Sequence, residues 1–134
     1  MPASIRWTSE QKASILIELV EPVTWEEFHR SVRDSHEMVR EVDHTVHLLI
    51  QVPAEMPDGN PLMHFSSAAK RQPVNIGRVF IVPPDNRANR IYSFAQRLSL
   101  IINKVYPGKS HVVFMQSLEQ ALALIGENET IALP

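Results

Sequence analysis

Four residues between Asn86 and Arg90 combine two guanidinium groups with two side-chain amides. They are Asn86, Arg87, Asn89 and Arg90, and they stand where the sequence predicts the start of a helix. The backbone N–H groups and the dipole of a helix N-terminus favour an anion, and arginine adds charge-assisted hydrogen bonds. This segment is therefore a ligand-binding candidate for a small anionic or lipid-like compound. The alternative is that both arginines are solvated side chains of a first helical turn.

The six histidines raise the question of a metal site. His29 and His36 are seven residues apart and can share one face of a helix, while His44 and His47 flank the start of a strand. Neither pair comes with a carboxylate at the spacing of a zinc-binding helix. The spacing favours surface histidines or histidines satisfied by hydrogen bonds, so we predict no metal and no cofactor.

Motifs for covalent catalysis are missing from the sequence. There is no Gly-x-Ser-x-Gly turn, and four glycines in all leave no glycine-rich phosphate loop. The absence of cysteine excludes disulfides, thiolate zinc sites and cysteine nucleophiles, and it fits a reducing cytoplasm. We therefore predict a protein that is not an enzyme.

The formal net charge of −2 conceals an uneven distribution of charge. Residues 1–59 carry 5 basic and 11 acidic side chains, residues 60–116 carry 8 and 1, and residues 117–134 carry 0 and 3. The middle segment can form an anion-binding face, or it can fold back beside the acidic half of the same chain. Its basic residues are spread over two predicted helices and several loops, which argues against nucleic-acid binding.

Length and composition are those of one globular domain. At 134 residues and 44% hydrophobic residues the chain can bury one core, so we expect a single domain over residues 1–134 with an ordered core over about 5–126. No apolar run approaches the roughly 18 residues of a membrane span, and no secretory h-region follows Met1. We predict a cytoplasmic protein without membrane contact.

Apolar periodicity and capping residues predict the elements that position these side chains. Alternation predicts a hairpin over the first 20 residues, and Thr24 with Glu27 forms a capping box for a helix over about 25–42. Residues 46–52 read as a strand covered on both faces. Asn60 and Pro61 then start a short helix that carries Leu62, Phe65, Ala68 and Ala69.

The second half of the chain continues the alternation of strand and helix. Residues 79–82 form another apolar strand, and a third helix is expected between Asn86 and Pro107. Residues 112–115 read as the last strand, Ser117 caps a fourth helix, and the tail from Asn128 is expected to fray. The order β-β-α-β-α-β-α-β-α predicts an α/β fold: a mostly parallel five-stranded sheet with an antiparallel N-terminal strand and helices on both faces.

This order resembles that of the STAS domain family, which includes bacterial anti-sigma factor antagonists. Three stretches make the chain similar to small bacterial STAS-like proteins: residues 24–28, residues 68–77 and residues 117–121. The resemblance implies a regulatory, non-enzymatic module of the bacterial cytosol that binds a protein partner.

Signalling STAS domains carry a phosphorylatable serine at the N-terminus of the helix that follows the central strand. Here Asn60 and Pro61 occupy that position, while Ser66 and Ser67 stand in Phe-Ser-Ser-Ala where the family has Asp-Ser-Ser-Gly. A phosphate at Ser66 would lie too far inside the helix to reach its free amides. We therefore expect a member without the serine phosphoswitch, in which both serines are ordinary helix residues.

Two surfaces are candidates for protein contacts. The first comprises the loop over 53–60 and the following helix, with Asn60, Met63, Ser66, Ser67 and Lys70 as the expected partner surface. The second is the third helix, where Leu100 and Tyr106 widen the apolar stripe and a second copy of the chain would cover them in a homodimer.

Overall fold

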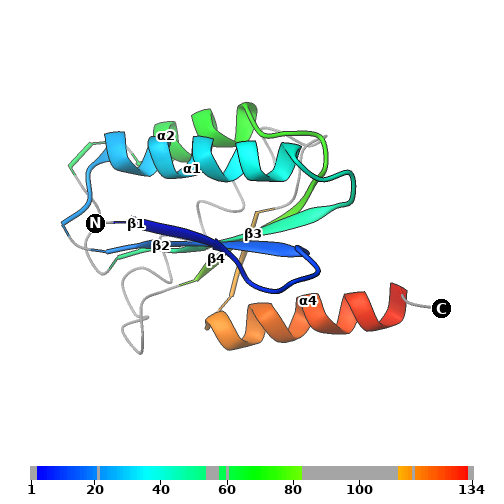
Figure 1. Ribbon diagram of the computed structural model, residues 1–134. Helices are drawn as coiled ribbons and strands as arrows, with labels where there is room; N and C mark the ends of the chain where they lie inside the picture. The colour runs from blue at the N-terminus through cyan, green and yellow to red at the C-terminus, as the bar shows by residue number, and fades with distance from the viewer. Residues whose placement is uncertain are drawn as a thin grey trace.

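The chain folds around a five-stranded mixed sheet, as the computed structural model shows (Figure 1). The structure describes residues 3–20, 22–53, 58–59, 61–82, 112–115 and 117–132. Its elements are β1 (Ala3–Trp7), β2 (Ser14–Leu19), α1 (Trp25–Arg40), β3 (Val46–Gln51), α2 (Pro61–Lys70), β4 (Ile76–Val82), β5 (Val112–Phe114) and α4 (Leu118–Ala132). The helix predicted between residues 86 and 107 lies outside the described residues.

The strands lie side by side in the order β1-β2-β3-β4-β5, which is also their order in the sequence. The hairpin makes β1 antiparallel to β2, and every other neighbouring pair is parallel. Lys12 adopts a φ of 56° in the hairpin turn, and its N–H donates to the Ser9 carbonyl at 3.1 Å. The predicted α/β class and the single antiparallel pair are confirmed.

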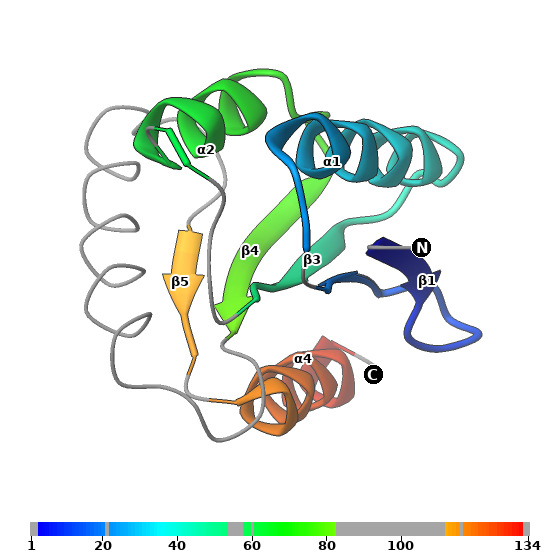
Figure 2. The same cartoon turned by 90° about the vertical axis from the view of Figure 1, so that its left-hand side faces the viewer.

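The consecutive strand order determines which face of the sheet each helix covers. Right-handed crossovers that advance in one direction place their helices on the same face. α1 and α2 connect β2 to β3 and β3 to β4, and both lie on one face, whereas α4 follows the last strand and lies on the other (Figure 2). α1 and α2 therefore become neighbours although they are separated by a strand in the sequence.

The sheet has a core on each face because side chains alternate along its strands. On the α1–α2 face, buried residues of β2 and β3 pack with helix residues; they include Ile15, Ile17, Leu48, Ile50, Phe28, Val32, Val39 and Phe65. On the α4 face the buried cluster is Leu16, Leu49, Phe80, Val82, Ala121 and Ile125. Burying each large apolar side chain stabilises the fold by about 1.5–3 kcal/mol.

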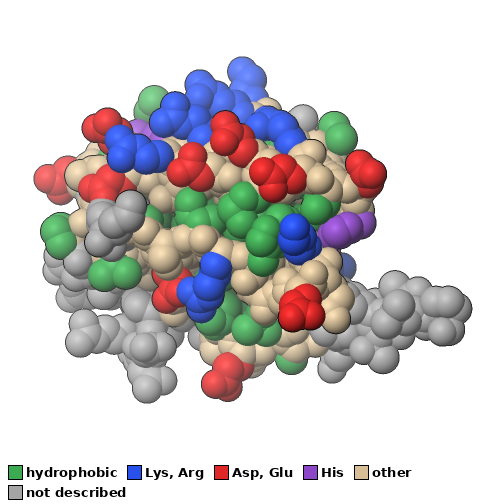
Figure 3. Space-filling model, in the orientation of Figure 1, with side chains coloured by type: hydrophobic (Ala, Val, Ile, Leu, Met, Phe, Trp, Pro, Cys, Tyr) green, Lys and Arg blue, Asp and Glu red, His purple; other side chains and the backbone are tan. Residues whose placement is uncertain are grey.

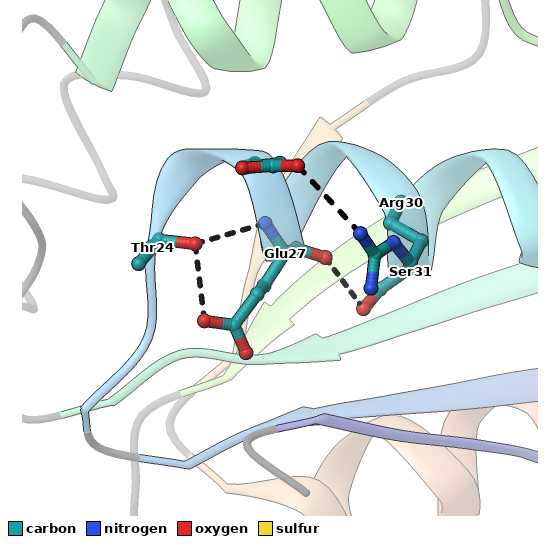
Figure 4. Close-up of polar contacts among 5 residues, drawn as sticks. Thr24, Glu27, Arg30 and Ser31 are labelled. Carbon is teal, nitrogen blue, oxygen red and sulfur yellow. Dashed lines mark hydrogen bonds and ion pairs between the residues drawn. The ribbon is translucent and has the colours of Figure 1, made fainter.

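The start of α1 confirms the predicted capping box (Figure 4). The Thr24 hydroxyl accepts a hydrogen bond from the Glu27 N–H at 3.1 Å and donates one to the Glu27 carboxylate at 3.0 Å. One turn later the Ser31 hydroxyl donates to the Glu27 carbonyl at 2.8 Å. The first of these contacts gives a partner to a backbone N–H that a helix start otherwise leaves without one.

α1 ends at Arg40, two residues before the predicted end, and a side chain from a later turn binds one carbonyl of its last turn and two carbonyls that follow the helix. The Asn75 amide N–H₂ group lies 3.0 Å from the Val39 carbonyl oxygen, 3.2 Å from that of Val42 and 3.1 Å from that of His44. β4 then begins directly after Asn75, at Ile76, three residues earlier than predicted. Long-range bonds of this kind leave no periodic signal in the sequence.

α4 also differs from the prediction at one end. Its start agrees, since the Gln120 N–H donates to the Ser117 hydroxyl at 3.2 Å. Its end does not, because the helix continues to Ala132 where fraying was expected from residue 128. None of the described helices is both long and apolar enough to cross a membrane.

Candidate functional site

A groove of about 250 Å³ runs between α1 and α2 on the outer side of these helices. We call it the α1–α2 groove, and its polar lining consists of Glu26, His29, Arg33 and His36 from α1 with Ser67 and Arg71 from α2 and the turn after it. The α1 residues are spaced three or four apart, so they share one face of that helix. Lys and Arg side chains gather over this part of the molecule (Figure 3).

His36 is the most buried polar residue of the groove, with 4% of its surface exposed. Its ring makes no hydrogen bond to any residue of the described part of the chain, although no fully enclosed polar side-chain atom there lacks a partner. Burial, assisted by the charge of Arg40, lowers the pKa of His36 from 6.5 to about 4. At neutral pH the groove therefore contains a neutral imidazole with one N–H donor and one free acceptor.

Arg33 and Arg71 contribute the positive charge of the groove, one from each side. Within the described ranges, neither guanidinium lies within ion-pairing distance of a carboxylate. Glu26, the acidic residue of the lining, instead pairs with Arg30 at 3.6 Å (Figure 4). Both arginine side chains are exposed, so their hydrogen-bond donors are available to a ligand from solvent.

One end of the groove is held closed by an aromatic cluster that joins α1 to α2. The Nε2 of His29 and the Nδ1 of His64 lie 2.8 Å apart, so one ring donates a hydrogen bond to the other. The His64 ring stacks on Trp25 at a centroid distance of 4.1 Å, and the Trp25 indole N–H donates to the Asp58 carbonyl at 2.8 Å. These contacts fix the distance between the two helices at this end.

Positive charge in the groove disfavours a further proton on His29. Burial and the neighbouring His64 lower the pKa of His29, and the guanidinium groups of Arg71 and Arg33 lower it further. Burial is the largest cause of this shift, and the two guanidinium groups add to it in the same direction.

Among the described residues, Ser67 makes no hydrogen bond to a histidine that could act as its base. The described residues also contain no group of three or more His, Asp or Glu side chains placed to hold a metal ion. His44 and His47, considered from the sequence as ligands, bond instead to the Lys12 carbonyl at 2.8 Å and the Arg78 N–H at 2.9 Å.

The predicted partner surface is present in part. Met63 and Lys70 are exposed on α2, and Ser67 is partly buried at the groove. Ser66 lies inside α2, more than a turn beyond its first residue, as the capping prediction required. Asn60 lies outside the described residues, as do the predicted ligand-binding residues Asn86, Arg87, Asn89 and Arg90 and the predicted dimer contacts Leu100 and Tyr106.

Sequence reasoning missed the α1–α2 groove as a site. The spacing of Glu26, His29, Arg33 and His36 on one helix face was available as a signal. The residues that contact this helix face could not be found in the same way. His64, for example, is 35 residues from His29 in the sequence, and the strand order brings the two together. A helix face with a mixture of His and Arg is also what an ordinary solvated surface looks like.

Comparison with protein-family models, with curated protein sequences and with solved structures gave no match. The resemblance to STAS domains consequently remains a prediction from the sequence. The candidate site is defined by the geometry of the described residues. It contains two guanidinium groups with no carboxylate partner among those residues and a buried imidazole with no hydrogen-bond partner among them.

Proposed function

We propose that this chain is a non-enzymatic interaction module of the bacterial cytosol, related to STAS domains, and that it binds a protein partner through the exposed side of α2. The observation that carries the proposal is Met63, whose surface is 67% exposed on a helix that has no acidic residue. An exposed methionine is a flexible apolar contact that can adapt to a partner surface.

The proposed contact residues form a stripe along α2. Met63, Ser67 and Lys70 are separated by four and three residues, which places them on one side of the helix. Such a stripe offers an apolar anchor at one end and a positive charge at the other. A partner with an apolar pocket flanked by acidic residues would complement it, with Met63 contributing most of the affinity.

Docking by this surface does not need serine phosphorylation. Ser66 and Ser67 lie within α2 rather than at its first residues. A phosphate there would not meet the free N–H groups of the helix N-terminus, which are what a phosphoserine at a helix start exploits. We therefore propose binding that is independent of the family's phosphoswitch.

Quantitative affinity purification from the native cell tests this function. The wild type is compared with a Met63→Glu, Lys70→Glu double variant and with Val20→Glu, a matched control at an apolar residue that is 54% exposed at the end of β2. We expect one protein to be recovered by the wild type and the control and lost with the double variant. The purified pair should then show at least a tenfold weaker Kd for the double variant, the effect of losing about 1.4 kcal/mol.

Equal recovery by all three proteins would contradict the proposal. Circular dichroism and thermal melting of each variant show that it is folded before binding is compared. An unchanged Kd of the purified pair on Met63→Glu alone would also exclude Met63 as the anchor.

A further inference from the structure

We propose that the α1–α2 groove binds the phosphate group of a small phosphate monoester, with Arg33 and Arg71 neutralising its charge and Ser67 and His36 donating hydrogen bonds. This ligand site goes beyond the docking function proposed for α2 and does not depend on it. The residues that would hold the phosphate come from two helices and therefore surround a ligand on more than one side.

The charge balance of the groove argues for an anion. Arg33 and Arg71 both line it, and neither pairs with a carboxylate of the described residues. Two like charges that share a small space repel each other, and a bound dianion turns that repulsion into attraction. Glu26 lies at the rim and is drawn toward Arg30, which reduces its opposition to an incoming anion.

His36 argues for a ligand with hydrogen-bond acceptors. The His36 side chain is 4% exposed, lines the groove and makes no hydrogen bond to a described residue. No fully enclosed side-chain polar atom of the described residues lacks a partner, so His36 is a donor available at the groove and not an orphaned group. A phosphate oxygen at the base of the groove would accept a hydrogen bond from its N–H.

The number of donors favours phosphate over a carboxylate. Each guanidinium presents several N–H groups in a planar fork, and Ser67 and His36 add one donor each. A carboxylate has two oxygens and one charge, whereas a phosphate monoester has three free oxygens and a charge near −2 at neutral pH. A phosphate monoester therefore matches the charge and the number of donors in the groove better than a carboxylate does.

The size of the groove limits the rest of the ligand. About 250 Å³ corresponds to roughly eight water molecules at about 30 Å³ each. It lies below the range of about 300–1,000 Å³ that is typical of pockets for drug-sized ligands. The apolar part of the lining, Val32 and Ala68, leaves room for a short organic group beside the phosphate. We therefore infer that the groove itself holds the phosphate and a short organic group, as in a phosphate ester of a small alcohol.

Isothermal titration calorimetry at constant ionic strength tests the proposal, with glycerol 3-phosphate and inorganic phosphate as probes. We expect one saturable site that binds glycerol 3-phosphate more tightly than inorganic phosphate. Arg33→Gln, Arg71→Gln should weaken binding at least tenfold. The matched control Lys12→Gln, Arg78→Gln removes the same charge at residues that do not line the groove, and it should bind like the wild type.

Nuclear magnetic resonance supplies a second measurement that does not rely on variants of the buried histidine. Addition of glycerol 3-phosphate should shift the ring signals of His36 and the amide signal of Ser67. Ser67→Ala should keep the shift at His36 but reduce affinity severalfold.

Four results would overturn the proposal. The first is unchanged binding by the Arg33, Arg71 variant. The second is equal weakening in the control variant, which would mean a general response to charge. The third is loss of binding only in Arg87→Gln, Arg90→Gln, which would move the site to the other basic segment. Binding of inorganic phosphate as tightly as the ester would exclude the ester as the ligand.

Discussion

The two faces of the sheet have similar interiors but different outer surfaces. Each face buries a cluster of large apolar side chains from the same strands. On one face the helices α1 and α2 carry histidines and arginines that meet in a groove. On the other face the C-terminal segment over residues 117–134 has no basic residue and no histidine. Among the described residues, the histidines and arginines that line a groove therefore belong to the α1–α2 face, and the proposed anion site rests on them.

Both faces of the sheet have an apolar interior. Truncation of a large side chain in either interior should give the largest loss in the free energy of unfolding. Phe28 represents the α1–α2 face. It is 1% exposed and packs against Phe65 with the two rings tilted at a centroid distance of 4.8 Å. Phe28→Ala should lower the free energy of unfolding by about 3–5 kcal/mol. Ile125, which is 4% exposed, represents the α4 face. Ile125→Ala should lower the free energy of unfolding by about 2–5 kcal/mol. Urea denaturation measures both, and a loss below about 1 kcal/mol at Ile125 would show that α4 is not part of one cooperative core.

Lowering the pH should destabilise the fold, with His36 on the α1–α2 face as the main contributor. The pKa of His36 is lowered from 6.5 to about 4, so between these values the unfolded chain binds more protons than the folded one. Stability conferred by the neutral ring is complete above pH 6.5 and is lost as the pH falls toward 4, a loss of about 3 kcal/mol. The pKa values of His29 and His47 are also lowered, which acts in the same direction.

Urea denaturation of the wild type and of His36→Leu at pH 7 and pH 4.5 checks this dependence. His36→Leu should lose less stability on acidification than the wild type, while His44→Gln, at an exposed histidine, should behave like the wild type. A His36→Leu variant with the full wild-type dependence on pH would show that the proton is taken up elsewhere.

Removal of a helix cap should give the smallest loss of stability on either face. Thr24→Ala removes the acceptor of the Glu27 N–H at the start of α1, and Ser117→Ala removes that of the Gln120 N–H at the start of α4. Each should cost about 1 kcal/mol. Thermal melting compares them, and Thr24→Ser, which keeps the hydroxyl, is the control. A larger loss at Thr24 than at Ser117 would show that α1 contributes more to the cooperative core than α4 does.

The sequence was sufficient to predict most of the described helices and strands because the signals for them are local. Alternation predicted the hairpin, the capping boxes predicted the starts of α1 and α4, and apolar runs predicted β3 and β4. The ends of elements were less accurate where a distant side chain decides them, as Asn75 does for α1. Local signals carry no information about such bonds.

The candidate site could not be predicted in the same way. From the sequence we placed the ligand at the predicted start of a helix near Asn86, where backbone N–H groups favour an anion. The described strands follow one another without a reversal, so the two helices on one face meet and form a groove between them. Arg33 and Arg71 become neighbours only in that topology. Arg87 and Arg90, which the sequence predicts to bind a ligand, lie outside the described residues.

The consecutive strand order also bears on how the chain assembles during synthesis. Each strand from β2 to β4 pairs with the one synthesised just before it, so a growing chain can add one strand and one helix at a time to an edge that already exists. No strand has to wait for a distant one to be inserted between two neighbours. The groove between α1 and α2 would then be complete when β4 joins the sheet, while the C-terminal helix is still to be made.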